Sequence, residues 1–214
     1  VYGPIVYHKM FNKNTKDGGK EIGQYLTPFA YFSVAASLFI SIFSEEALII
    51  LAPPEYLSGL GVINILCISL AFGLFTKQPQ LMYAGKTVIL SVLTFINFIF
   101  TLIILYYFVN RFGVLGAAIG YLLVSIVYNA LYVWQGQKYY KIEYEWFKLA
   151  GFYGMLIFMS ISIILFRVWE FAYMNRLIIK IIYLAIFTGL GMYLKIITRD
   201  NLLLILKSNK PVKV

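Results

Sequence analysis

The clearest structural signal in this sequence lies between residues 77 and 120. The segment begins with K-Q-P-Q-L-M-Y-A-G-K (residues 77–86) and ends with R-F-G-V-L-G-A-A-I-G (residues 111–120). Between the two motifs run about twenty mostly apolar residues, with Asn97 among them, which is the length of a membrane-crossing helix. The segment predicts a polar tip broken by proline, one hydrophobic helix, a very short turn and a second helix rich in Gly and Ala.

The composition is that of a membrane protein. Hydrophobic residues make up 61% of the chain and charged residues 13%, with a mean hydropathy of +0.81, whereas about a quarter of a soluble domain is charged. The net charge of +9 comes from basic residues between the apolar segments, a pattern that predicts contact with anionic lipid and no nucleic acid. Cys67 and His8 are single residues, so no disulfide, metal centre, catalytic triad or cofactor is predicted.

The apolar segments predict an all-α polytopic membrane protein with about six transmembrane helices, because a backbone in hydrocarbon must pair its polar groups internally. Residues 1–24 are expected to hold the end of a preceding helix and a basic loop. Residues 25–136 hold four helices, 137–148 a loop, 149–194 two more helices, and 195–214 a basic tail. The expected spans are 25–44, 60–83, 87–109, 112–134, 149–168 and 177–194.

The distribution of basic residues predicts the orientation. Because successive loops alternate sides, one side of the membrane receives most of the lysines, and by the positive-inside rule that side is cytoplasmic. Both ends of the chain are then expected there. The residues that define this side are Lys9, Lys13, Lys16, Lys20, Lys86, Lys138, Lys141, Lys148, Lys195, Arg199, Lys207, Lys210 and Lys213.

The candidate substrate-binding residues are Lys77, Gln78, Gln80 and Asn97. Lys77 follows a long apolar run and precedes Pro79, and an ionisable residue at membrane depth commonly faces a cavity. The alternative is that Lys77 extends its ammonium group to the interface. The two glutamines would line a wet pocket beside a broken helix. For Asn97, the alternative is a hydrogen bond across a helix interface.

Other polar residues near the spans have structural interpretations. Asn64 and Asn129 are expected to form hydrogen bonds between helices. Glu45 and Glu46 are expected to form a solvated pair at the membrane interface, and Lys180 to extend its side chain to water. No acidic residue lies deep inside a predicted span. A site with Lys77 and amides suits an anion such as a pyrophosphate head group better than a cationic drug.

Several of these motifs together resemble one transporter family. E-A-L-I-I-L-A-P-P-E-Y (residues 46–56), the Y-A-G-K tip (83–86), the helix with Asn97 and R-F-G-V-L-G-A-A-I-G (111–120) are similar to the C-terminal half of polysaccharide transporters, the O-antigen flippases. These belong to the multidrug/oligosaccharidyl-lipid/polysaccharide flippase superfamily. Because the sequence begins at Val1, we expect an N-terminal lobe to be missing.

The resemblance implies one lobe of a two-lobed bundle in the bacterial cytoplasmic membrane. The expected cargo is an undecaprenyl-pyrophosphate-linked oligosaccharide for surface polysaccharide assembly. Its transfer would be coupled to H⁺ or Na⁺ in some members, and the resemblance implies no enzymatic activity. In relatives, basic cavity residues meet the anionic head group, a role that maps here to Lys77. The alternatives are a multidrug exporter of the same superfamily and a membrane-embedded glycosyltransferase or acyltransferase.

Overall fold

The computed structural model describes residues 18–73, 75 and 80–196. Every regular element in these ranges is a helix, which confirms the all-α prediction. The elements are α2 (Gly18–Ile42), α3 (Ser44–Leu51), the 3₁₀ helix η1 (Pro54–Gly59), α4 (Leu60–Phe72), α5 (Gln80–Tyr83), α6 (Thr87–Tyr139), α7 (Trp146–Val168) and α8 (Tyr173–Tyr193).

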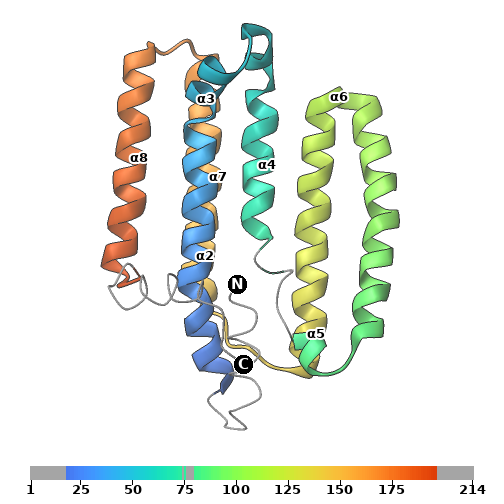
Figure 1. Cartoon of the computed structure of the whole chain (residues 1–214). Coiled ribbons are helices and arrows are strands. Elements are labelled where there is room, and N and C mark those ends of the chain that lie inside the picture. The colour runs from blue at the N-terminus through green and yellow to red at the C-terminus, as the bar shows by residue number, and fades with distance from the viewer. Residues whose placement is uncertain (1–17, 74, 76–79, 197–214) are drawn as a thin grey trace.

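Five helical segments are long and apolar enough to cross a membrane, which supports a multi-pass membrane protein. They are α2, η1 with α4, α6, α7 and α8. Helix α6 has 53 residues and is interrupted at Gly113, whose φ of 59° and ψ of −137° are not helical. At this point the chain reverses (Figure 1). We call residues 87–112 the first arm of α6 and residues 114–139 the second arm.

Several helix boundaries differ from the ranges that the sequence suggested, and two of the differences are large. Helix α2 begins at Gly18, inside the expected basic loop, because Gly19 and Gly23 pack closely against the backbone of residues 141–143. Helix α4 ends at Phe72, within the expected span 60–83, and α5 follows as a separate short helix. Pro79, at which a kink is expected, lies outside the described residues.

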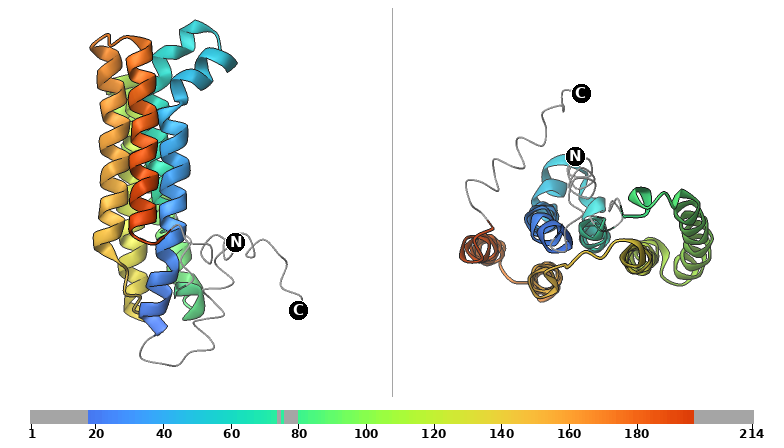
Figure 2. Two further views of the ribbon diagram at one scale, coloured as in Figure 1. Left: turned by 90° about the vertical axis from the view of Figure 1, so that its left-hand side faces the viewer. Right: turned by 90° about the horizontal axis from the view of Figure 1, so that it is seen from below.

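Helix α2 is the central element of the bundle. It packs against α4, α7 and α8, and the end-on view in Figure 2 shows these helices around it. An unbroken ridge at four-residue spacing runs along its buried face, as expected of a helix that contacts its neighbours over its whole length. The ridge consists of Ile22, Leu26, Ala30, Val34, Leu38 and Ile42, all at most 3% exposed.

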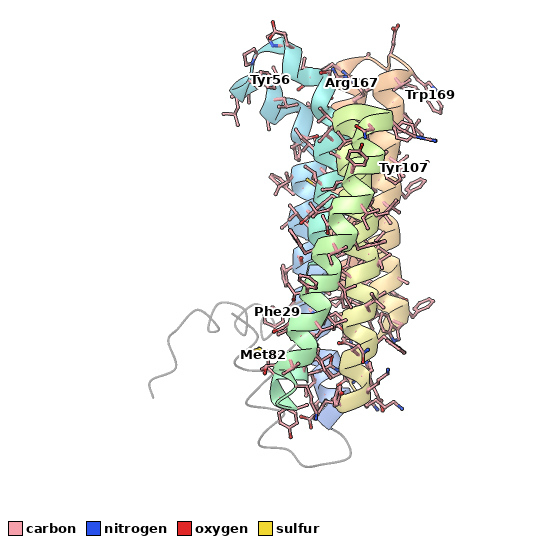
Figure 3. The ribbon with its side chains drawn as sticks, turned by 90° about the vertical axis from the view of Figure 1, so that its right-hand side faces the viewer. Phe29, Tyr56, Met82, Tyr107, Arg167 and Trp169 are labelled. Atoms are coloured by element: carbon pink, nitrogen blue, oxygen red, sulfur yellow. The ribbon has the colours of Figure 1, made fainter. Side chains whose placement is uncertain are left out.

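The remaining helices expose large apolar side chains. The two arms of α6 expose Phe95, Phe98 and Ile103 among many others, and side chains of this kind cover the outer surface in Figure 3. Tyr107 and Trp169 lie near the upper end of the bundle in that view. Apolar surface flanked by aromatic residues is compatible with contact to a lipid bilayer.

The two arms of α6 are in close contact at Gly116. A Cβ atom at this position would lie 2.0 Å from the carbonyl oxygen of Phe108 on the first arm. A Cβ atom on Gly120, one turn later, would lie 3.3 Å from the side chain of Leu105 and 3.4 Å from that of Ile104, which is a tight fit. The Gly116–Gly120 pair therefore provides the small surface that membrane helices need for close contact.

We expect Gly116→Ala to destabilise the protein by about 1–3 kcal/mol, because the new methyl group forces the two arms apart. Thermal unfolding of the purified protein in detergent would measure the effect as a lowered Tm. The control is Gly154→Ala on α7, where an added Cβ meets no atom within 4 Å. A Tm for Gly116→Ala equal to that of the control would show that the arms are not in close contact.

Candidate functional site

A polar groove lies between α4 and the two arms of α6. Its volume is 380 Å³, and it is open along one side. Helix α4 forms one wall, and the arms of α6, held together at Gly116, form the others. Hydroxyl and amide groups line it, contributed by Ser69, Asn97, Thr101, Tyr121, Ser125, Tyr128 and Asn129.

Two buried polar atoms beside the polar groove have no hydrogen-bond partner among the described residues. They are Oδ1 of Asn129 and Oγ of Ser69. The Asn129 side chain is held in place because its Nδ2 donates to the carbonyl oxygen of Ser125 at 2.7 Å. An unpaired polar atom in an apolar environment costs free energy, so these two atoms favour a polar ligand or water in the groove.

Of the two predicted site residues that the structure describes, Gln80 and Asn97, only Asn97 lies in the polar groove. It also lines a smaller apolar cavity between the arms. Thr101 donates to the backbone carbonyl of Asn97 at 2.6 Å. Within the described part of the chain the Asn97 side chain has no hydrogen-bond partner. Its amide can therefore donate to and accept from a ligand.

Gln80 lies outside the polar groove. Its side chain is fully buried, and Nε2 donates to the carbonyl oxygen of Tyr140 at 2.6 Å. The Gln80 side chain packs against Gly136, where a Cβ atom would collide with it. In this structure Gln80 joins α5 to the end of α6. Lys77 and Gln78 lie outside the described residues.

The polar groove offers neutral hydrogen-bonding groups. None of its described lining residues is charged. The described residues also contain no group of three or more His, Cys, Asp or Glu side chains that could hold a metal ion. Cys67 is buried nearby on α4 and is a small apolar side chain there. The groove is therefore suited to bind a hydroxyl-rich, uncharged group.

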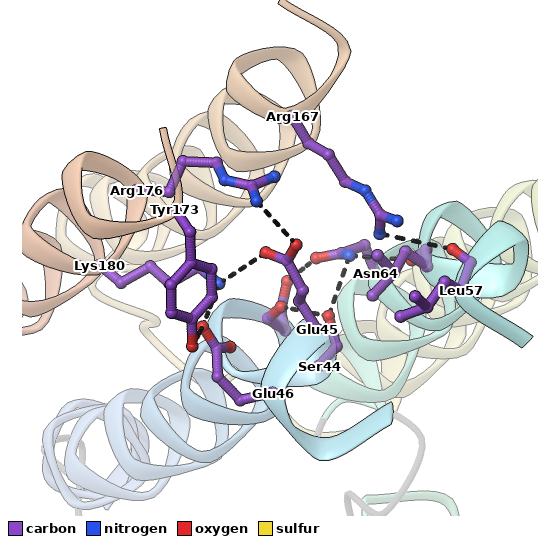
Figure 4. A network of polar contacts seen from close by, with 11 residues as sticks. Ser44, Glu45, Glu46, Leu57, Asn64, Arg167, Tyr173, Arg176 and Lys180 are labelled. Atoms are coloured by element: carbon purple, nitrogen blue, oxygen red, sulfur yellow. Dashed lines mark hydrogen bonds and ion pairs between the residues drawn. The ribbon is translucent and has the colours of Figure 1, made fainter. Parts of the chain in front are cut away.

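A second polar cluster lies at the upper end of the bundle and corrects two predictions. Glu45 is 6% exposed and Lys180 fully buried, so neither the solvated glutamate pair nor the water-exposed lysine is right. Lys180 Nζ lies 3.1 Å from Glu45 Oε2 and 2.6 Å from Glu46 Oε1. Arg176 contacts Glu45 Oε1 at 3.1 Å (Figure 4). We call these four residues the charge cluster.

The charge cluster forms because a pair of glutamates on α3 faces a pair of cations on α8. Glu45 and Glu46 stand in the first turn of α3, while Arg176 and Lys180 lie one turn apart on α8. Two carboxylates meet two cations, so the cluster is neutral in total. The charges were visible in the sequence, but nothing in either segment indicates its partner more than 130 residues away.

A network of neutral side chains continues from the charge cluster into the bundle. Asn64 of α4 donates to Ser44 at 3.3 Å and accepts a hydrogen bond from Ser41 (Figure 4). Ser41 and Ser160 of α7 are 2.8 Å apart. The expected interhelical role of Asn64 is therefore confirmed, and the four helices α2, α3, α4 and α7 are joined at this level.

We expect Lys180→Met to destabilise the protein by about 3–5 kcal/mol, because it leaves buried carboxylates without their cation. Denaturation in detergent, followed by circular dichroism, would measure this. The control is Lys148→Met, which removes the more exposed pair between Lys148 and Glu145 and should cost about 1 kcal/mol or less. Equal losses in the two variants would contradict a buried, mutually dependent cluster.

No protein-family model, curated protein or solved structure matches this chain. The resemblance to polysaccharide transporters therefore stays a prediction from the sequence.

Proposed function

We propose that this chain is one lobe of a membrane transporter that moves a lipid-linked oligosaccharide from one leaflet to the other. The observation that carries the proposal is the polar groove, because hydroxyl and amide groups gather between α4 and the arms of α6, and two of their oxygens have no partner among the described residues. Polar residues at such depth are costly unless they pair or bind something. Oligosaccharides present many hydroxyl groups, which neutral donors and acceptors such as Asn97 and Asn129 can bind.

In this proposal the sugar crosses through the polar groove while the lipid tail stays in the bilayer. The two lobes would rock about the cargo, as transporters built from repeats do. The second lobe would close the open side of the groove. The carrier that we propose is undecaprenyl pyrophosphate, and Lys77, outside the described residues, is the proposed partner of its anionic group. Coupling to H⁺ or Na⁺ would use residues of the complete protein.

The proposed topology has six crossings, with α6 supplying two, and places the basic lower end in the bacterial cytoplasm. Lys20, Lys86, Lys138, Lys141 and Lys148 lie at that end. At the upper end the cations Arg176 and Lys180 are paired with carboxylates, whereas of the five lysines named at the lower end only Lys148 forms such a pair. This asymmetry supports the orientation under the positive-inside rule.

The charge cluster also favours lipid-linked sugar over a cationic drug. A binding site for such drugs needs a free carboxylate, and Glu45 and Glu46 are already neutralised by Lys180 and Arg176. The described lining of the polar groove supplies no acid in their place. The multidrug exporter is therefore the weaker candidate.

The proposal predicts that Asn97→Ala reduces export of surface polysaccharide at least severalfold while the protein stays in the membrane. The loss of one amide from a polar site removes hydrogen bonds worth about 1 kcal/mol each. Surface polysaccharide would be measured in a deletion strain that carries the complete gene with this change. The matched control is Asn110→Ala, on the same arm but exposed and outside the groove.

Full export by Asn97→Ala, at the same protein level as the control, would remove Asn97 from the transport path. If the deletion strain lost drug resistance and kept its surface polysaccharide, the function itself would be contradicted. The deletion strain and its parent should therefore be tested for drug sensitivity in parallel.

A further inference from the structure

A separate apolar cavity lies on the other side of the contact between α4 and α6. Its volume is 350 Å³, and apart from Asn129 its lining side chains are apolar. Phe72 and Phe75 come from α4 and the residues after it, Ala130 and Trp134 from the second arm of α6, and Trp146 from α7. The second arm and α7 stand on either side of α4 and are linked below it (Figure 2).

The lower end of this cavity adjoins a second, more polar one. The polar cavity has a volume of 480 Å³ and is lined by Gln137, Lys141 and Glu143, and it shares Trp146 with the apolar cavity. Lys138 places its ammonium group 3.5 Å from the ring centroid of Trp134. Neither Lys138 nor Lys141 has an acidic partner in the described residues. Lys141 therefore lines the polar cavity, and Lys138 lies over Trp134, which lines the apolar cavity.

The linker that carries Lys141 is held in a fixed position. Gln137 bonds to both backbone groups of Ile142, accepting from its N–H at 2.8 Å and donating to its carbonyl at 2.7 Å. The N–H of Glu143 donates to the carbonyl of Gly19 at 3.2 Å. The position of Lys141 relative to the apolar cavity is thus set by the fold.

We propose that these two joined cavities bind an anionic phospholipid. One acyl chain fills the apolar cavity, and the phosphate lies against Lys141 and Lys138. A site of this kind, basic and between membrane helices at the lysine-rich end, is typical of those that bind anionic head groups. The apolar walls disfavour water as an occupant. The cation–π contact between Lys138 and Trp134 keeps a positive charge at the boundary between chain and head group.

A resident phospholipid fits this site better than the transported cargo. The polar groove and the apolar cavity share Asn129 and otherwise have different lining residues. A molecule whose sugar occupies the groove would have to pass its tail between α4 and the second arm to reach the cavity, and these helices are in contact where Ser125 meets the carbonyl of Ser69. The lipid site therefore does not depend on the transport function.

The test is native mass spectrometry of the complete protein in detergent with added phosphatidylglycerol or phosphatidylcholine. The wild type should retain phosphatidylglycerol more strongly. Lys141→Gln should weaken that binding about fivefold, the effect of one basic charge near a membrane surface. Ala130→Phe should abolish it, because the ring fills the cavity. The controls Lys86→Gln, at the same end but outside the cavity, and Ala185→Phe, exposed on α8, should bind as the wild type does.

Equal retention of phosphatidylglycerol by Lys141→Gln, Ala130→Phe and both controls would overturn the proposal. Equal binding of the two phospholipids by the wild type would do the same, because it removes the role of the charge. Displacement of phosphatidylglycerol by polyprenyl pyrophosphate at equal concentration would assign the site to cargo and so refute a resident lipid. Gel filtration and circular dichroism would show whether each variant is folded. If Ala130→Phe does not fold, the test is decided by Lys141→Gln, which changes an exposed residue.

Discussion

Hydrocarbon offers no partner to a hydrogen-bonding or charged group, so the protein must supply each one itself. This constraint explains the uniformly helical backbone, the pairing of Lys180 with two glutamates and the bond between Asn64 and Ser44. Some buried polar atoms are nevertheless left without a hydrogen-bond partner in the described part of the chain. Ser69 and Asn129 keep unpaired oxygens at the polar groove. Other buried atoms without a partner among the described residues lie on Gln80 and, in the charge cluster, on Glu46 and Arg176.

Polar contacts also determine how α8 attaches to the bundle. Helices in lipid gain little from hydrophobic association, because the surrounding chains are as apolar as the side chains. Helix α8 is fixed at two levels instead. Tyr31 stacks on Phe187 and donates to its backbone carbonyl at 2.9 Å, and the charge cluster holds the upper end. These directional contacts specify one position and one rotation of α8 against α2.

The sequence predicts those features that depend on local pattern. Apolar length indicates the spans, and R-F-G-V-L-G-A-A-I-G indicates a turn followed by a helix with a small-residue face, which the structure places at Gly113 and Gly116. It could not reveal contacts between distant segments. Charged residues near a span end look solvated until their partners are known, as with Glu45. Among the predicted site residues, Asn97 reaches the polar groove, whereas Gln80 contacts the end of α6.

The reversal at Gly113 gives the two arms of α6 an unusual mechanical position. Among the described elements they rest chiefly on α4 and the short α5, and Leu122 and Val133 of the second arm also touch the hydrophobic core around α2. The width of the polar groove is therefore set by the angle at which the two arms meet α4.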